Sequence, residues 1–379
     1  MNGANRLFSA RLVRFSITPA LALLAGLGNV FSVSLAFGVD LIFGPIFVFV
    51  AIAFLSLPAS LLVAGTCGAV TWVMWGHPYA AMVFVLEAMV VFGFHRRKGK
   101  SLLSADILFW ITAGMPITLL YLTQRIGLPF ESSWLITLKQ FINAVFNVLL
   151  ASLAVLLINV GLGRFSRFYL GRQQIKNILF HSLVALTLGA GTLPIIQSGK
   201  NDERNTESLL VARLSGLLNH LATDVELSRQ PADEVLADFV ARPRIDPSLA
   251  FAILDPFGTV IASKGDPWTD QLRATSPPMK EGELRFLEPD GDLSFVQALR
   301  QGRYQMAQAV NNGEPLTVVV QAPSGPVAAQ LAGAAFKLVI LLGILLLLAI
   351  VASQILSRVL TAPIWRLATA LNSSTNGIV

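Results

Sequence analysis

An uninterrupted apolar run near the C-terminal end constrains this chain more than any other feature. Residues Leu338–Leu356, LVILLGILLLLAIVASQIL, contain no charged side chain. A membrane-spanning helix needs about 20 predominantly apolar residues, so this run is long enough to cross a bilayer. The chain of 379 residues is 54% hydrophobic and only 13% charged, whereas a soluble domain is about 25% charged. The sequence therefore predicts an integral membrane protein whose surface contacts the lipid bilayer.

Eight stretches of the chain are candidate transmembrane helices. They are residues 16–37, 41–57, 59–75, 79–94, 103–123, 136–161, 178–196 and 332–354. The three runs within 41–94 are short and interrupted by Gly and Pro, so the number of spans there stays open. The first 36 residues also have the basic start and small residues of a signal peptide, but their apolar stretch exceeds the usual 7–15 residues.

Positive charge is concentrated beside these apolar runs. Four clusters hold 13 Lys and Arg residues, namely Arg6–Arg14, His95–Lys100, Arg164–Lys176 and Arg358–Arg366. Because Lys and Arg accumulate in cytoplasmic loops, the clusters place both termini in the cytoplasm. Residues 199–328 hold 18 of the 22 acidic residues and are predicted to lie outside. Basic residues that flank apolar runs are typical of membrane anchors, so nucleic acid is not an expected partner.

The predicted outer domain begins with a long amphipathic helix over Asn201–Arg229. Its apolar residues recur three and four positions apart, which is the spacing of one helical face. They are Leu210, Leu214, Leu217, Leu221 and Val225. This stripe fits either a dimer seam or a face packed on the domain's own sheet. A homodimer is the expected oligomeric state.

Short β-type runs follow a second predicted helix, Glu234–Ala241. Turn residues such as Asn311-Asn312-Gly313 separate the runs. The predicted strands are Leu249–Leu254, Thr259–Ser263, Leu293–Leu299, Tyr304–Val310 and Leu316–Gln321. A long helix followed by about five antiparallel strands predicts an α+β fold with one sheet and helices on one side.

Two segments of this domain carry a resemblance to a known family. They are the strand–turn–strand FAILDPFGTVIAS, Phe251–Ser263, and the exit LTVVVQAPSGPVAAQL, Leu316–Leu331. In these segments the chain resembles the extracytoplasmic Cache, or PAS-like, domains of bacterial receptors. The resemblance implies a single sensor module that detects a small-molecule ligand outside the inner membrane of a bacterium.

The ligand contacts of such a module are not obvious from the sequence. Aromatic side chains and isolated charged groups commonly fix small ligands in pockets. The candidates of this type are Asp255, Trp268, Arg273, Arg300 and Tyr304. Each of them also fits a role in the core or on the solvated surface.

The segment after the last span resembles the first helix of a HAMP signalling linker. This is Ser357–Leu371, SRVLTAPIWRLATAL, with Val359, Ile364 and Leu367 as the expected buried face. Pro363 is expected near a helix start, where a missing N–H does no harm. The resemblance implies that a cytoplasmic output follows in a longer protein, and a basic tail that only anchors the span is the alternative.

Residues 38–155 resemble a multi-span module at the front of some bacterial sensor kinases and diguanylate cyclases. The matching segments are Phe37–Phe47, Thr71–Ala80, Val85–Phe92, Ser104–Pro116 and Leu138–Ser152. This resemblance implies an architecture rather than a ligand.

Several polar residues lie within or beside these spans. An ionised carboxylate such as Glu87 is costly inside a membrane without a partner, and Lys139, Asn143 and Asn147 share one helical face. Asn143 matches Glu87 in expected depth and is its predicted partner, while Asp106 is expected to pair with the basic cluster His95–Lys100. A pocket for a small ligand or proton is predicted from Asp40, His77, Glu87, Lys139, Asn143 and Asn147. The alternative is a set of interhelical hydrogen bonds, each worth about 1 kcal/mol.

No catalytic motif is present in the sequence. It has no Walker loop, HExxH, GxSxG or GGDEF motif, and no histidine is followed by an acid as in a kinase phosphoacceptor helix. The single cysteine, Cys67, forms no intrachain disulfide, and no metal site or cofactor is predicted. The sequence favours the sensor region of a receptor with a histidine kinase output; the alternatives are a diguanylate cyclase output and a transporter or channel with a regulatory outer domain.

The predicted organisation joins an all-α membrane bundle of about eight helices to an α+β outer domain. Its segments are a multi-span module of about six helices at 1–162, a basic cytoplasmic loop at 163–177, a transmembrane helix at 178–198, the Cache/PAS-like domain at 199–330, a transmembrane helix at 331–355 and the start of a HAMP-like linker at 356–379.

Overall fold

The structure is a computed structural model. It describes residues 3–36, 39–161, 172–265, 282–287 and 301–375. The chain is mostly helical and divides into two units, which we call the bundle unit (Met1–Gly199 with Ala335–Val379) and the sheet unit (Lys200–Ala334). Helices α8 (Arg172–Leu227) and α11 (Ser324–Thr375) each contribute residues to both units.

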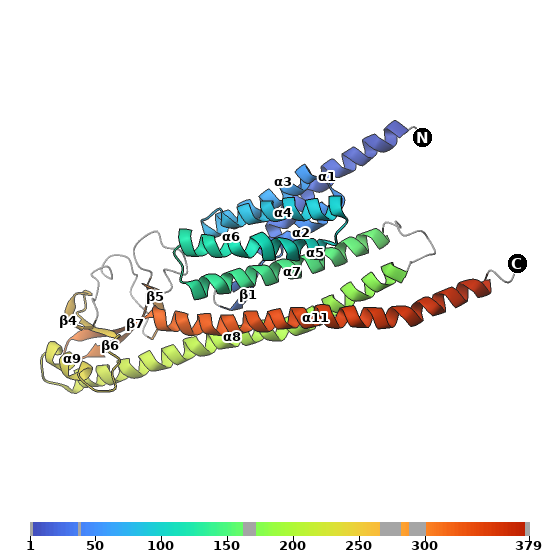
Figure 1. Cartoon of the computed structure of the whole chain (residues 1–379). Coiled ribbons are helices and arrows are strands. Elements are labelled where there is room, and N and C mark those ends of the chain that lie inside the picture. Colours follow the sequence, from blue (N-terminus) through green and yellow to red (C-terminus); the bar gives the residue numbers. More distant parts are fainter. Residues whose placement is uncertain (1–2, 37–38, 162–171, 266–281, 288–300, 376–379) are drawn as a thin grey trace. The chain divides into compact units, whose positions relative to one another are not determined.

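The bundle unit consists of helices and one small hairpin (Figure 1). Besides its parts of α8 and α11, it contains α1 (Gly3–Val30), β1 (Val33–Ala36), β2 (Val39–Leu41), α2 (Gly44–Phe54), α3 (Leu57–Trp75), α4 (Tyr79–Lys98), α5 (Leu102–Phe109), η1 (Trp110–Gly114), α6 (Met115–Leu120), η2 (Tyr121–Arg125) and α7 (Phe130–Gly161). Helix α4 packs between α3 and α5, and α5 also packs on α7. The spans of this unit therefore have one another as neighbours.

Within the described residues, six helices are long and apolar enough to cross a membrane. They are Leu57–Trp75, Tyr79–Lys98, Leu102–Arg125, Phe130–Asn159, Ile175–Leu227 and Ser324–Pro363. Their length and composition give the chain the character of a membrane protein. Two further apolar segments, Ile17–Val30 and Gly44–Phe54, are shorter.

The prediction of about eight spans is not confirmed at the first two. The predicted span 16–37 ends as a helix at Val30 and is followed by the β1–β2 hairpin, and the predicted span 41–57 is the 11-residue helix α2. At 1.5 Å per residue, α2 is only about 16 Å long. The Phe43 N–H donates to the Gly28 carbonyl at 2.9 Å, and the Gly44 N–H donates to Asn29 Oδ1 at 2.9 Å. These bonds tie the start of α2 to the end of α1.

The fifth predicted span contains two π-helical segments, η1 and η2, on either side of α6. Pro116 lies at the start of α6 but inside the continuous helical run from α5 to η2, where it lacks the N–H that would bond to the preceding turn. A Cβ on Gly114 would lie 2.7 Å from Cε3 of Trp110, so the indole occupies the space that a side chain would need. Single π-helical turns are frequent at functional sites.

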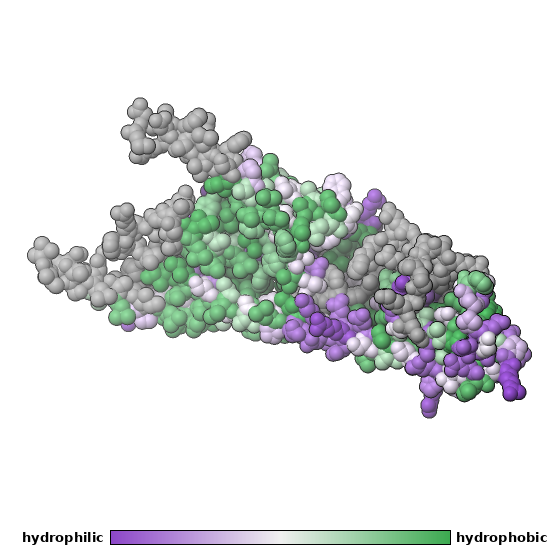
Figure 2. Space-filling view, turned by 180° about the vertical axis from the view of Figure 1, so that it is seen from behind, coloured by the Kyte–Doolittle hydropathy of each residue, from purple (hydrophilic) through white to green (hydrophobic). Residues whose placement is uncertain are grey.

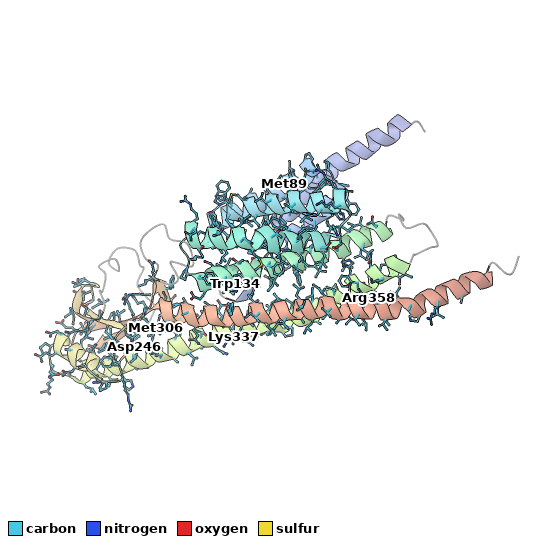
Figure 3. All side chains as sticks on the ribbon, in the orientation of Figure 1. Met89, Trp134, Asp246, Met306, Lys337 and Arg358 are labelled. Atoms are coloured by element: carbon cyan, nitrogen blue, oxygen red, sulfur yellow. The ribbon has the colours of Figure 1, made fainter. Side chains whose placement is uncertain are left out.

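The outward face of the bundle unit is apolar. Exposed side chains on its helices include Met89 of α4 (Figure 3) and Val73 of α3. Figure 2 shows this face as a broad hydrophobic area over the bundle helices. Apolar side chains that point outward on span-length helices are the expected contacts for lipid.

The sheet unit is built on five antiparallel strands. They are β3 (Ala250–Leu254), β4 (Val260–Lys264), β5 (Arg285–Leu287), β6 (Arg303–Asn311) and β7 (Pro315–Pro323), in the spatial order β4-β3-β7-β6-β5. Counted in chain order, the strands lie in the order 2-1-5-4-3. The register pairs Phe251 with Val320 and Ile253 with Val318, and these four side chains belong to the unit's buried core.

Helices α8 and α9 (Ala232–Val240) contribute to the same core. The stripe that starts at Leu210 on α8 packs against strand residues such as Phe251, so packing on the domain's own sheet is the correct alternative within one chain. The predicted helix Glu234–Ala241 and four of the predicted strands match α9, β3, β4, β6 and β7 within two residues. The fifth predicted strand, Leu293–Leu299, lies outside the described residues, and β5 was not predicted.

The segment that resembles a HAMP helix continues α11 without interruption to Thr375. The expectation that Pro363 lies near a helix start is wrong, because this proline lies inside the helix. The hydroxyls of Ser357 and Thr361 donate to the carbonyls of Gln354 and Ser357 just before it. In the single chain Val359 and Leu367, two residues of the expected buried face, are exposed.

Candidate functional site

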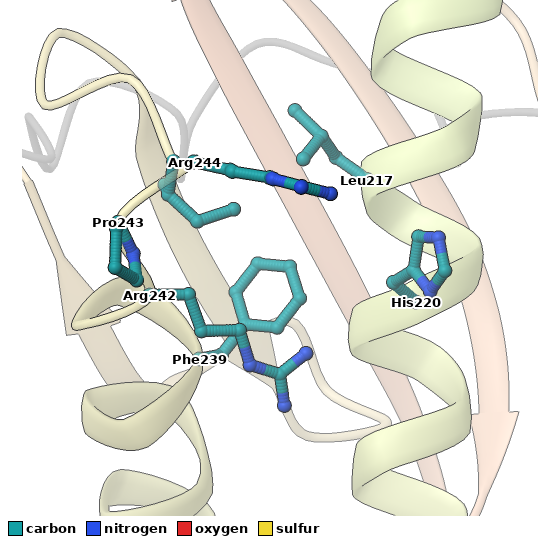
Figure 4. Close-up of a pocket in the computed structure, with 7 residues that line it drawn as sticks. Leu217, His220, Phe239, Arg242, Pro243 and Arg244 are labelled. Atoms are coloured by element: carbon teal, nitrogen blue, oxygen red, sulfur yellow. The ribbon is translucent and has the colours of Figure 1, made fainter.

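A hollow of about 420 Å³ opens in the sheet unit between α8 and the connection from α9 to β3 (Figure 4). It is lined by Leu217, His220, Phe239, Arg242, Pro243, Arg244 and Ile245. Leu217 and His220 come from α8, one turn apart on the same face. Pockets for small organic ligands typically enclose about 300–1,000 Å³, so the hollow is large enough for one.

Two ion pairs hold the connection against α8. Arg213 of α8 pairs with Asp246 at 2.9 Å, and Asp224 of α8 pairs with Arg242 at 2.5 Å. Figure 3 marks Asp246 in this connection. Hydrogen bonds from the backbone N–H and hydroxyl of Ser248, together with Arg213, hold the pKa of Asp246 below its usual value. The connection is therefore anchored on both sides of the hollow.

The arginines of the hollow differ in their partners. Arg242 is engaged by Asp224 and lies over the Phe239 ring at 5.0 Å from its centroid. Arg244 makes no ion pair within the described part of the chain, and Figure 4 shows its side chain extending across the hollow toward Leu217. His220 faces the same space from α8. Three nitrogen-bearing side chains and an apolar floor can together hold a small organic anion.

Of the outer-domain candidates named from the sequence, the two that the structure describes, Asp255 and Tyr304, do not line this hollow. Asp255 accepts hydrogen bonds from the N–H groups of Phe257 at 2.9 Å and Thr259 at 2.7 Å, so its carboxylate stabilises the turn between β3 and β4. The ring of Tyr304 lies 5.3 Å from that of Phe286. Burial and the carboxylates of Glu207 and Glu203 raise the pKa of the Tyr304 hydroxyl. Trp268, Arg273 and Arg300 lie outside the described residues.

The contacts of the six candidates in the bundle unit fall into three groups. Lys139 of α7 is buried with its Nζ 5.7 Å from the centroid of Trp75, and its charge interacts with that of Asp40. His77 lies next in this group, 6.2 Å from both Trp75 and Tyr79 between ring centroids. Burial lowers the pKa of His77 below its usual value.

The two asparagines on α7 form a second group. Asn147 Nδ2 donates to the carbonyl of Ile42 at 2.9 Å, which joins α7 to the segment after β2. Asn143 is buried, and its Oδ1 has no hydrogen-bond partner among the residues that the structure describes. For Asn147 the structure thus favours the alternative of an interhelical hydrogen bond.

Glu87 belongs to a third group, and its predicted pairing with Asn143 is wrong. Its Oε1 accepts a hydrogen bond of 2.5 Å from Nε1 of Trp110, and its carboxyl lies within hydrogen-bonding reach of Asp106. The predicted pairing of Asp106 with His95–Lys100 is also wrong. The Lys100 N–H donates to the Phe94 carbonyl at 3.2 Å, so the chain folds back and α5 begins beside the last turn of α4. Asp106 thereby reaches Glu87 rather than the basic cluster.

Sequence reasoning missed His220, Arg242, Arg244 and Trp110. A usable signal was present in Arg242-Pro243-Arg244, because a proline between two basic residues just after a helix fixes a short, cationic connection. No comparable signal marks His220, which joins the hollow only through the packing of α8 on the α9 end. Trp110 reads as an ordinary apolar residue of a span.

Comparison with known proteins identifies no relative of this chain. No protein-family model, no curated protein and no solved structure matches it.

Proposed function

We propose that this chain is the sensor region of a bacterial transmembrane receptor, and that a small carboxylate-bearing ligand binds in the hollow beside α8. The observation that carries the proposal is the position of the hollow on a helix of 56 residues, Arg172–Leu227, whose N-terminal part is apolar enough to span a membrane. A ligand held there contacts the same helix that enters the bilayer.

The ligand class follows from the lining. An Arg guanidinium binds a carboxylate through two parallel hydrogen bonds, and Arg244 is free of ion pairs within the described residues. Leu217, Phe239 and Ile245 offer apolar contacts for the organic part of such a ligand. A five-stranded antiparallel sheet with α8 and α9 in its core also agrees with the single Cache/PAS-like module implied by the sequence resemblance.

The proposed signal path uses the two spans that adjoin the sheet unit in the chain. A ligand that bridges Arg244 and α8 pulls α8 toward the α9–β3 connection. Within the bundle unit α8 packs against α11 at Gly191, where a Cβ would lie 2.5 Å from Leu345. A displacement of α8 is thus felt by α11, which continues into the HAMP-like segment Ser357–Leu371.

The proposed orientation comes from the positive-inside rule, which places the sheet unit on the outer side of the inner membrane. We propose a histidine kinase as the output that α11 controls in a longer protein, with a diguanylate cyclase as the second choice. Both outputs fit a receptor whose last span continues into a signalling helix.

Binding and displacement are tested on the full chain in lipid nanodiscs. A panel of small mono- and dicarboxylates is screened by thermal shift, because a ligand that binds only the folded state raises its stability by mass action. Isothermal titration then compares the wild type with Arg244→Ala and with Arg204→Ala, an exposed arginine of α8 outside the hollow. We expect at least a tenfold weaker affinity for Arg244→Ala and no change for Arg204→Ala. Wild-type affinity in Arg244→Ala would refute the site.

The receptor role needs a second measurement. Spin labels at Leu193→Cys of α8 and Leu347→Cys of α11, both exposed positions, report the distance between the two spans. The native Cys67 is buried and therefore protected from labelling. We expect the ligand to shift the distance distribution in the wild-type hollow and not in Arg244→Ala. Ligand binding without any shift of the distance distribution would refute the receptor proposal and support only a ligand-binding domain.

A transporter or channel is the second candidate function. The observation that favours it is the burial of the ionisable residues Glu87, Asp106 and Lys139 inside the bundle, since ionisable residues within spans commonly mark transport pathways. Ligand-dependent flux through proteoliposomes that contain the full chain would support this function over signalling.

A further inference from the structure

Glu87 of α4 and Asp106 of α5 lie side by side in the interior of the bundle unit, and we call these two side chains the carboxyl pair. Glu87 is 2% exposed and Asp106 is 0% exposed. Their carboxyl groups lie within hydrogen-bonding reach of each other, and Nε1 of Trp110 donates to Glu87 Oε1 at 2.5 Å. The pair therefore links the fourth and fifth predicted spans at a buried point of the bundle unit.

Asp106 lacks any donor among the residues that the structure describes, since neither of its carboxyl oxygens has a hydrogen-bond partner. Ionised carboxylates only accept hydrogen bonds, so two of them cannot satisfy each other. One added proton changes this, because a single O–H then donates from one carboxyl group to the other. The same proton removes the repulsion between two buried negative charges.

No cation described in the structure replaces that proton. Besides Asp106, the titratable groups of the described residues that interact with Glu87 are the thiol of Cys67 on α3 and the hydroxyl of Tyr79 on α4, and neither carries a positive charge. Helix α2 has no ionisable side chain. Lys139 of α7 interacts with Asp40 instead, and Arg96 of α4 donates to the backbone carbonyls at Ile52 and Leu55.

The local backbone holds the pair in place. Trp110 is the first residue of the π-helical segment η1, and the missing side chain at Gly114 leaves room for its indole. The indole N–H is a donor only, so it supports Glu87 as the acceptor end of the pair. Asp106 and Trp110, one turn apart, approach the same carboxyl group from one face of the fifth span.

We propose that the carboxyl pair is a proton-binding site that keeps α4 and α5 together. In the bound state one proton is shared between the two carboxyl groups. When it is released, the O–H bond breaks, the proton passes to water, and two buried carboxylates face each other without a donor for Asp106. The contact between α4 and α5 then loosens, so the occupancy of the site by a proton sets the packing of the bundle.

Infrared difference spectroscopy of the full chain in nanodiscs tests the site, because a protonated carboxyl group has its own carbonyl band. We expect the wild type to show one such band at neutral pH and to lose it as the pH rises. Glu87→Gln and Asp106→Asn each supply an amide N–H donor to the remaining carboxylate, so both variants should lose the band while keeping the fold. Asp40→Asn, a partly exposed carboxyl that faces Lys139, should leave the band unchanged.

The absence of a protonated carboxyl band in the wild type at neutral pH would overturn the proposal, whatever the variants do. A band retained in both amide variants would also overturn it. Repeating the titration in sodium chloride and in choline chloride separates protons from metal cations. If sodium but not choline removes the band at neutral pH, the pair binds sodium and the assignment to protons is wrong. Equal titrations in the two salts support it.

Discussion

The two units of this chain differ in which side chains they bury and which they expose. In the sheet unit the buried core consists of side chains such as Phe239, Phe251 and Leu214, and the charged residues of the described segments lie on its surface. In the bundle unit Glu87 and Lys139 are buried, while leucines and valines cover the outside. Figure 2 shows the hydrophilic residues gathered on the sheet unit and the hydrophobic residues gathered on the bundle helices. The difference shows that the surrounding solvent, water or lipid, determines which side chains of a helix are buried.

Each arrangement follows from its surroundings. In water, burying apolar surface is worth about 25 cal/mol per Å², so the sheet unit gains stability from its apolar core. In lipid, an apolar side chain gains almost nothing by leaving the bilayer for the protein. Interhelical hydrogen bonds, such as the bond from Asn147 to the Ile42 carbonyl, and close packing must hold the bundle instead.

The largest expected effect is on the sheet unit. Phe251 is fully buried and lies 5.4 Å from the ring of Phe239 between centroids. Phe251→Ala should lower the free energy of unfolding of this unit by about 3–5 kcal/mol, through lost burial and the cavity left behind. Denaturant titration of the full chain measures the loss. Phe257→Ala, in the turn between β3 and β4 where the ring is 92% exposed, is the control and should change little.

Replacing an exposed apolar residue with Asp in each unit tests whether the residue faces lipid or water. Ile111 of η1 is 60% exposed and Leu209 of α8 is 67% exposed, so simple exposure predicts the same tolerance for both. Ile111→Asp should destabilise the bundle by about 2.5–3.5 kcal/mol, because it places a charge in the hydrocarbon region. Leu209→Asp should cost less than about 0.5 kcal/mol, because it faces water. Equal thermal stability of both variants in nanodiscs would contradict the assignment of Ile111 to lipid and of Leu209 to water.

Close packing between spans is the next test. Gly191→Val places a side chain where a Cβ would lie 2.5 Å from Leu345, whereas a Cβ on Gly189 meets nothing within 4 Å. Overpacking typically costs about 1–3 kcal/mol, and we expect Gly191→Val to fall in this range. Gly189→Val carries the same change in helix propensity and is the matched control. The spin-label distance between α8 and α11 should increase in Gly191→Val alone.

The smallest expected effect concerns an exposed ion pair. Asp246 has a folded-state pKa below its usual value of 3.8, so its contribution is complete above this pH and is lost as the pH falls through the folded pKa. Because the pair with Arg213 is solvent-exposed, Asp246→Asn should cost at most about 1 kcal/mol at neutral pH. The difference in stability between the variant and the wild type should shrink in acid and in high salt. A difference that persists below the folded pKa would show that the carboxylate is not its source.

The sheet unit was the more predictable of the two from sequence. The stripe from Leu210 to Val225 has the period of a helix because water lies on one side of α8, and the strands stand out as short β-type runs between turn residues. Turn residues such as Asp255 and Gly258 then mark where strands end. The strand Arg285–Leu287 was not predicted, because three residues of mixed polarity are too few to show a period.

The bundle was less predictable because its helices are apolar on both sides, so periodicity cannot tell lipid from core. The end of the first helix was not predicted, because it depends on Asn29, whose side chain accepts a hydrogen bond from the N–H of Gly44 fifteen residues later. The contact between Glu87 and Asp106 depends on the register of two antiparallel helices, which the folded-back Lys100 sets. The hollow was not predicted either, because it forms only where α8 packs against the connection from α9 to β3, which is distant from it in sequence.

The two π-helical segments of the fifth span carry a consequence for how the span presents its residues. Its buried positions include Leu102, Asp106, Trp110, Gly114, Thr118 and Leu122, at a constant interval of four. In a regular α-helix with 3.6 residues per turn, this interval would drift by about 40° at each step, or about 200° over the series. The wider π turns absorb this drift and keep the residues on one side. Deleting one residue from η1 would therefore rotate Thr118 and Leu122 out toward the lipid while leaving Asp106 in place.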